Sequence, residues 1–372
     1  MNRTTKTLTY VIGIIMTIAM VGSLILPMLS SNIGQAEIDA EAGRPTPLPA
    51  PTFPPPPDTA AISFDRKYLH NSGLFTLGAP TGWSASAGSN TANELRASLT
   101  NADLLSVIEA RISQDQTGIT DSEALSAFLD KTWLGQTWSG YSRWDETSRK
   151  ITADGIVQID FNLSRGRSHM IARQESWLEG GDIYSVRVVM AENAPDELKY
   201  ILRGVIDSIE RLPIYAEAPF GWAAYFDNID KHIVRYPSDW EVTDAAEGLP
   251  ATIIGDGASL VLSTIDVAVK SEDDAIDWIQ GWRSGVKARS VTAVEVDGNA
   301  GYKVSYRLST LDGETESGLA IMLNGADNRL HVANLRLNNI SDDLLEVEPS
   351  EFPWLAAIDS FRLLPDLQAD LQ

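Results

Sequence analysis

An aromatic run in the first part of the chain has the residue types best suited to binding a ligand. Trp133, Trp138, Tyr141 and Trp144 follow one another closely and are interleaved with glycines. If exposed, such rings stack on sugar rings or hold a peptide. If buried, they cap a core, because Trp and Tyr pack well with a polar atom at the edge. The run is therefore the candidate ligand or partner surface, and core packing is its plainer interpretation.

The four histidines do not show the spacing of a reaction centre. His70, His169, His232 and His331 are scattered, and no HExxH, nucleophile elbow, P-loop or dinucleotide fingerprint is present. We expect structural or solvent-facing histidines, no catalytic residue and no enzyme. A cryptic hydrolase stays open as an alternative, and it would require His169 or His331 in a pocket within reach of a Ser and a carboxylate.

The charge of the chain excludes some ligands. The net charge is −22, and it is concentrated in residues 212–372, which hold 11 basic and 27 acidic side chains. Such a surface repels phosphate backbones, so we expect no nucleic-acid partner. The acidic clusters at 272–274 and 312–316 lack the alternating spacing of a calcium loop. We predict no metal and no cofactor, and the absence of cysteine excludes thiol chemistry.

The N-terminal residues have the pattern of a membrane anchor. No charge interrupts Leu8–Leu29, and a helix of this length is ~33 Å long against a hydrocarbon core of ~30 Å. Arg3 and Lys6 precede the segment, which predicts a cytoplasmic amino terminus and an exported remainder. A cleaved signal peptide, the competing interpretation, normally has an apolar region of only ~7–15 residues. We predict an anchor at 1–30, a proline-rich stalk at 31–60 and localisation to the plasma membrane as a single-pass protein.

The sequence of the rest of the chain indicates an internal duplication. Residues 206–213 (IDSIERLP) return as residues 358–365 (IDSFRLLP). Each copy begins with a strand ended by Pro-x-x-Trp, at Trp83 and Trp240, and continues with two extended segments joined by a tight turn. A helix with a capping-box pattern follows, at 120–123 and 271–274, and then an Asp-Gly turn into alternating strands. The closing helix buries Leu198, Ile201, Leu202, Val205 and Ile206 in the first copy.

These features predict an α+β protein. We expect two tandem α-β-α sandwich domains, residues 61–213 and 214–372, each a mainly antiparallel sheet flanked by helices. The ordered set of Pro-x-x-Trp, Asp-Gly strand and Asp-Ser tail resembles the PsbP-like fold family, named after an extrinsic subunit of photosystem II and shared with a Ran-binding import factor. The resemblance covers roughly 64–213 and 219–366, and it implies an accessory or binding role without catalysis.

The sequence therefore predicts a non-catalytic, membrane-anchored extracytoplasmic protein that presents two PsbP-like domains to a protein partner. One alternative is a cell-wall or glycan-binding module that uses Trp133–Trp144, which requires those rings to be exposed and coplanar. The other alternative is the hydrolase described above.

Overall fold

The computed structural model describes residues 62–371 except 65, 89, 116, 193–196, 216–217, 244–245, 247, 310–314 and 348–353. These residues belong to one compact unit, residues 53–372. The predicted anchor at 1–30 and stalk at 31–60 lie outside the described residues. Among the helices that the structure describes, none is long and apolar enough to cross a membrane.

The first half (residues 62–215) contains most of its strands before its longest helix. Its elements are β1 (Arg66–Leu69), β2 (Phe75–Ala79), β3 (Ser84–Ala87), β4 (Glu94–Asn101), β5 (Ser106–Gln114), α2 (Ser122–Phe128), α3 (Lys131–Thr137), β6 (Arg143–Ile151), β7 (Val157–Arg165), β8 (Ser168–Glu179), β9 (Asp182–Ala191), α4 (Glu197–Asp207), β10 (Glu210–Arg211) and the 3-10 helix η2 (Pro213–Tyr215).

The second half (residues 218–371) repeats this order with one helix fewer in the middle. Its elements are β11 (Trp222–Asp227), β12 (His232–Pro237), β13 (Glu241–Thr243), β14 (Ala251–Gly255), β15 (Ala258–Ile265), α5 (Glu272–Trp282), β16 (Val286–Val296), β17 (Asn299–Ser309), β18 (Thr315–Asn324), β19 (Leu330–Asn338), α6 (Leu355–Asp359), β20 (Arg362–Leu363) and β21 (Asp370–Leu371).

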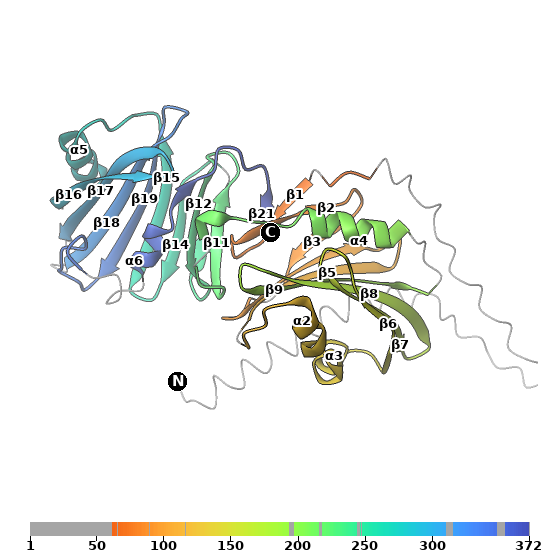
Figure 1. Ribbon diagram of the computed structural model, residues 1–372. Coiled ribbons are helices and arrows are strands. Elements are labelled where there is room, and N and C mark those ends of the chain that lie inside the picture. The colour runs from red at the N-terminus through yellow and green to blue at the C-terminus, as the bar shows by residue number, and fades with distance from the viewer. Residues whose placement is uncertain are drawn as a thin grey trace, which may run out of the picture. The chain divides into compact units, whose positions relative to one another are not determined.

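The described chain is mainly antiparallel β-sheet, arranged in four sheets (Figure 1). The two seven-stranded sheets have the same strand order, β3-β4-β5-β9-β8-β7-β6 and β13-β14-β15-β19-β18-β17-β16. Smaller sheets, β10-β2-β1-β21 and β11-β12-β20, complete the two halves. The predicted pair of α-β-α sandwiches is therefore wrong. The helical patterns are short, at most 11 residues, so small sheets supply much of the covering that was expected from helices.

Several local predictions are confirmed. The tight turns near residue 102 and residue 256 close the β4–β5 and β14–β15 hairpins. Ser271 caps α5 in a capping box with Asp274. In the first copy the capping residue is Asp121, whose side chain accepts a hydrogen bond from the Ala124 amide, rather than Thr120. The sequence does not predict the edge strands β6 and β16. The side chains of β6 are mostly polar and exposed, and a register shift between Ala288 and Ser290 interrupts the apolar alternation of β16.

The two faces of the first seven-stranded sheet support different cores. One face carries Leu95, Ile108 and Val186, and it packs against the small sheet and α4, whose Ile201, Leu202, Val205 and Ile206 are buried as predicted (Figure 1). The Leu198 side chain lies outside the described residues. The opposite face carries Val107, Val189 and Phe161, and the seven-residue helices α2 and α3 pack on it. Because these helices are short, they cover only part of that face.

A serine after each closing helix explains the repeated Asp-Ser motif. The Ser208 hydroxyl donates to the Val205 carbonyl and accepts from the Gly78 amide, both at 2.7 Å. The Ser360 hydroxyl donates to the Ala357 carbonyl at 2.6 Å and accepts from the Arg235 amide at 2.7 Å. Each serine thus ties the end of a helix, where carbonyls lack partners, to the second strand of the opening hairpin.

The two halves also contact each other directly. The buried Arg235 side chain belongs to the second half, and its Nε donates to the Ser72 carbonyl of the first half at 2.6 Å. Burial lowers the pKa of Arg235 to about 10. The Tyr215 hydroxyl donates to the Ser360 carbonyl at 2.6 Å, and β21 pairs in parallel with β1. The small sheet of the first half is therefore completed by a strand near the C-terminus.

Removing either serine hydroxyl is expected to destabilise the protein. Ser208→Ala or Ser360→Ala leaves a strand amide without its acceptor, at a cost of about 1–3 kcal/mol in the free energy of unfolding. Urea denaturation followed by circular dichroism measures this cost, and Ser86→Ala on the exposed part of β3 is the control. Two variants as stable as the wild type would contradict the role assigned to the serines.

Two buried histidines predict a loss of stability in acid. Burial lowers the pKa of His70 and of His232 from 6.5 to about 4. Between these values the unfolded chain binds more protons than the folded chain, so stability rises with pH and is lost as pH falls from about 6.5 to about 4. Each histidine contributes about 3 kcal/mol to that loss.

Urea denaturation across this pH range tests the prediction. His70→Gln and His232→Gln should each flatten the decline, since glutamine does not titrate, while His169→Gln on the exposed end of β8 should leave it unchanged. A decline of equal steepness in all three variants would assign it to other groups.

Candidate functional site

The four aromatic residues singled out in the sequence belong to the α3 region, and they do not form a flat platform. Trp138 is fully buried and meets Phe161 at 58° and Tyr141 at 69° between ring planes. Trp144 also meets Phe161, at 66°. Trp133, Tyr141 and Trp144 are half-buried against this core. The arrangement lacks the exposed, coplanar rings that the glycan-binding alternative requires.

A cavity of about 250 Å³ lies beside Trp133, between α3 and the uncovered part of the sheet. We call it the arginine cavity. Its lining residues come from α3 and from four neighbouring strands, β4, β5, β9 and β8: Arg96, Glu109, Arg111, Trp133, Gln136, Thr137, Ser139, Gln174, Ser185 and Arg187. The strand residues form two cross-strand rows on one face. Arg96 pairs with Arg111 and Arg111 with Ser185, while Glu109 pairs with Arg187 and Arg187 with Gln174.

Arginines and tryptophans stack on each other at this cavity. The Arg111 guanidinium lies 5.1 Å from the Trp133 ring centre, and the Arg187 guanidinium lies 4.5 Å from that of Trp138. Such contacts hold the guanidinium planes in place. Glu94 forms ion pairs with both Arg96 and Arg111, and Glu109 pairs with Arg187.

Burial leaves Arg111 incompletely satisfied. Its pKa is lowered, first by burial, although the carboxylate of Glu94 opposes the shift. Its Nε is buried and has no hydrogen-bond partner among the described residues. A buried donor without an acceptor costs free energy, so a ligand that accepts from it gains that energy back.

The wall of the cavity is polar although it is buried. Gln174 and Ser185 line the cavity and are 1% and 7% exposed, and Ser176, which contacts both of them, is 0% exposed. Their side chains bond to one another: the Gln174 amide donates to the Ser176 hydroxyl at 3.2 Å, and the Ser176 and Ser185 hydroxyls lie 2.8 Å apart. Placing such groups inside a protein gains little over apolar packing, so their presence calls for a reason other than folding.

The second half shows that the fold does not need these polar groups. The β4–β5 hairpin can be aligned with the β14–β15 hairpin at their turns. The pairing of each strand with the next then gives, for each strand residue of the first half, its counterpart in the second half. Gln174 then corresponds to Ala320, Ser176 to Met322 and Ser185 to Val332. The three second-half residues form a continuous apolar core. At these three positions the buried polar side chains therefore belong to the first half, while Arg187 corresponds to the buried Asn334 of the second half.

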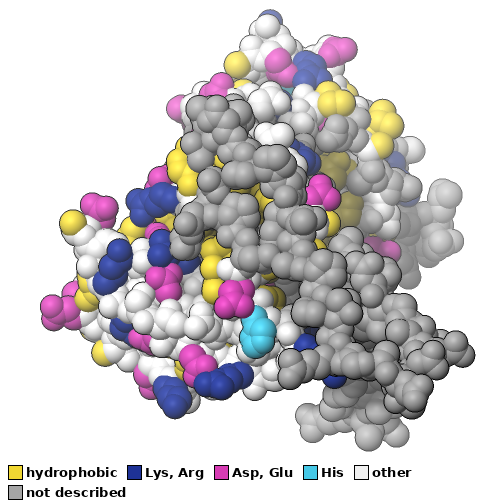
Figure 2. Space-filling view, turned by 90° about the vertical axis from the view of Figure 1, so that its right-hand side faces the viewer, with side chains coloured by type: hydrophobic (Ala, Val, Ile, Leu, Met, Phe, Trp, Pro, Cys, Tyr) yellow, Lys and Arg dark blue, Asp and Glu magenta, His cyan; other side chains and the backbone are white. Residues whose placement is uncertain are grey.

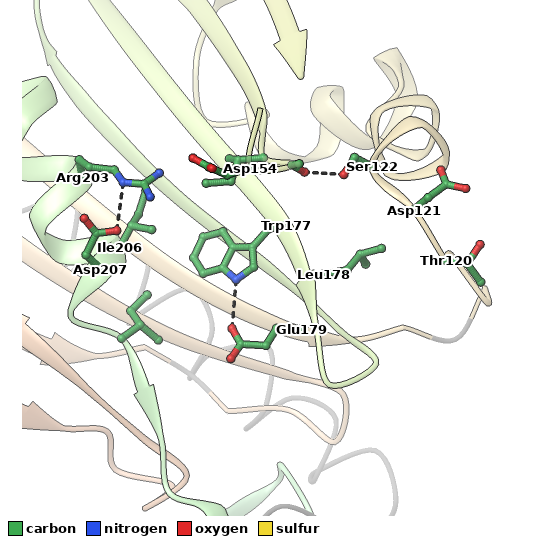
Figure 3. Close-up of a pocket in the computed structure, with 13 residues that line it drawn as sticks. Thr120, Asp121, Ser122, Asp154, Trp177, Leu178, Glu179, Arg203, Ile206 and Asp207 are labelled. Carbon is green, nitrogen blue, oxygen red and sulfur yellow. Dashed lines mark hydrogen bonds and ion pairs between the residues drawn. The ribbon is translucent and has the colours of Figure 1, made fainter. Parts of the chain in front are cut away.

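A second, larger cavity of about 440 Å³ lies at the ends of the β8–β9 and β6–β7 hairpins (Figure 3). The Trp177 ring stands within it, and its Nε1 donates to Glu179 at 3.2 Å. Asp207 pairs with Arg203 at 3.0 Å. Asp121 caps α2. These exposed carboxylates have partners within the fold, so this cavity needs no ligand to satisfy them.

The histidines lie outside both cavities. His70 is buried and contacts the Ser72 hydroxyl at 2.8 Å, and His169 is exposed. His331 is buried, with Nδ1 3.2 Å from the Thr264 hydroxyl and Nε2 3.2 Å from Asp327. This hydroxyl belongs to a threonine rather than the serine that the hydrolase alternative required. Neither cavity lining includes a histidine.

Charged side chains of both signs are mixed on the face of the molecule that Figure 2 shows. Figure 2 shows basic and acidic side chains interspersed on the visible face, with apolar side chains scattered between them. Within the part of the chain that the structure describes, no three His, Asp or Glu groups gather as metal ligands. Asp274 of the acidic cluster at 272–274 belongs to the α5 capping box, and residues 312–314 of the other cluster lie outside the described residues.

Comparisons with known proteins give only remote likenesses. No protein family and no curated protein matches the chain. Among solved structures, cyanobacterial PsbP from Synechocystis sp. PCC 6803 is 17% identical with a TM-score of 0.28, covering 38% of this chain and 92% of that one. The immunity protein TplEi of the type VI secretion system of Pseudomonas aeruginosa is 10% identical, with a TM-score of 0.25 and coverage of 82% and 99%.

A third structure, the Tle4–Tli4 complex, is 12% identical with a TM-score of 0.24 and covers 83% of this chain and 99% of that one. The first of the three belongs to the family that the sequence resembles, and the others are an immunity protein and a protein complex. At these TM-scores none of the likenesses carries an argument about this chain.

Replacing the buried polar wall by its second-half counterparts is expected to preserve the fold. The triple variant Gln174→Ala, Ser176→Met, Ser185→Val exchanges a polar network for apolar packing, so its free energy of unfolding should equal or exceed that of the wild type. Urea denaturation measures the difference. Marked destabilisation would show that the polar wall serves folding rather than binding.

Proposed function

We propose that this protein is a non-catalytic, membrane-anchored extracytoplasmic binding protein, and that its first half contacts a protein partner through the arginine cavity. One observation supports this proposal most strongly. The same sheet occurs twice, and the first copy keeps buried polar side chains at Gln174, Ser176 and Ser185, where the second copy has the apolar Ala320, Met322 and Val332. Since folding is achieved without them, binding is the role that remains for them.

The surroundings of the cavity suit recognition better than a reaction. Arg111 and Arg187 are held over tryptophans, and hot spots of protein interfaces are rich in Trp and Arg. The lining holds no histidine that would serve as a general base. Its size suits a single side chain or chain end of a partner rather than a whole structural element.

A photo-crosslinking residue at Gln136 tests the proposal in native cells. Gln136 lines the cavity from α3, two residues before Trp138. Gln280 on α5 stands two residues before Trp282 in the second half and serves as the matched control. We expect a discrete crosslinked protein from position 136, absent from position 280 and lost in the triple variant.

Equal labelling from both positions, or a label at position 136 that the triple variant retains, would contradict the proposal. Full-length protein is used in every arm, so that the predicted anchor and stalk are present.

A further inference from the structure

Resting on the function proposed above, we infer that the group taken by the arginine cavity is a singly charged carboxylate, supplied by an acidic side chain or a chain end of the partner. A binding role by itself does not specify which chemical group of the partner enters the cavity.

The donors of the cavity point to an anion. Three guanidinium groups, those of Arg96, Arg111 and Arg187, line a space of about 250 Å³. Arginine's planar fork matches a carboxylate, which accepts two parallel hydrogen bonds from it. Arg111 stands at the centre of one row, next to Arg96 on β4 and Ser185 on β9, and its buried Nε has no partner among the described residues.

The acidic side chains around the cavity limit the charge of that anion. Glu109 lines it, and Glu94 neutralises part of the charge of Arg96 and Arg111. A phosphate or sulfate dianion would meet Glu109 with a second negative charge, whereas a carboxylate brings only one. The site therefore favours a monoanion that shares Arg111 with Glu94.

The remaining lining residues suit a short stem behind the carboxylate. Trp133 provides an apolar wall whose ring already faces the Arg111 guanidinium. Gln136, Thr137 and Ser139 add side-chain groups that can form hydrogen bonds with a peptide backbone at the mouth of the cavity. Chemically, this combination selects an acidic peptide segment.

The test uses the protein labelled with 5-fluorotryptophan and observed by fluorine NMR, with the Trp133 resonance assigned from Trp133→Phe. The probes are short peptides of Gly and Ser, acetylated at the N-terminus. One has a central Glu and an amidated end, one a central Gln and an amidated end, and one a central Gln and a free carboxylate end. Inorganic phosphate is the fourth probe.

We expect the Trp133 resonance to shift saturably with the Glu peptide, the free-end peptide or both, and not with the amidated Gln peptide. The arm that responds identifies the source of the carboxylate. Arg111→Gln should weaken binding about tenfold or more, because a charge-assisted hydrogen bond is lost. Arg143→Gln, an exposed arginine on β6, is the control and should leave the affinity unchanged.

The triple variant, which keeps Arg111 but loses the polar wall, should lose the response while remaining folded. An equal response to the amidated Gln peptide, no response to either carboxylate, or tighter binding of phosphate would overturn the inference. Crosslinking from position 136 that persists while every carboxylate probe fails would reject the ligand class and leave the binding role standing. Carboxylate binding without crosslinking would reject the protein partner instead.

Discussion

The hydroxyl groups of Ser208 and Ser360 hold together the layers on which both halves depend. A seven-stranded antiparallel sheet with apolar side chains on one face must bury that face, and in each half the opening hairpin and the closing helix do so. A helix end and a strand both present backbone groups without partners at this junction. One serine satisfies a helix carbonyl and a strand amide at once.

The strand residue whose amide donates this hydrogen bond to the serine differs between the halves, and the difference affects how the halves join. In the first half it is Gly78, where a Cβ would come within 2.6 Å of the Phe64 carbonyl oxygen. In the second half it is Arg235, whose side chain reaches the Ser72 carbonyl and lies over Tyr215. A buried guanidinium is tolerated only when it is paired with acceptors, so the contact commits Arg235 to this junction.

The two seven-stranded sheets also differ on the faces that point away from the opening hairpins. In the row that corresponds to Gln174 the second half has Ala320 and Val261 on either side of the buried Asn334. Its arginine over a tryptophan, Arg336 over Trp282, comes from a neighbouring row. In the first half the equivalent region is polar, and Trp133 and Trp138 lie over its arginines. The two sheets thus share a strand order but differ at Gln174, Ser176 and Ser185, whose counterparts in the second half are apolar.

Local chemistry determined what the sequence alone could predict: the hairpin turns, the capping box at Ser271 and the buried stripe of α4. These depend on neighbours within a few residues, so spacing and residue type suffice. The sequence also pointed to the region of Trp133, but not to Arg111 or Gln174, which lie on strands distant in the chain. Only pairing of β5, β9 and β8 brings those side chains into neighbouring rows on one face of the sheet.

Which elements cover each face of the large sheets was also decided by the tertiary structure and not by local sequence. Small sheets and short helices share the covering of the cores, and β21 crosses from the end of the chain to β1. Such pairings follow from long-range burial of apolar faces and from edge amides that need partners, neither of which leaves a local signal in the sequence.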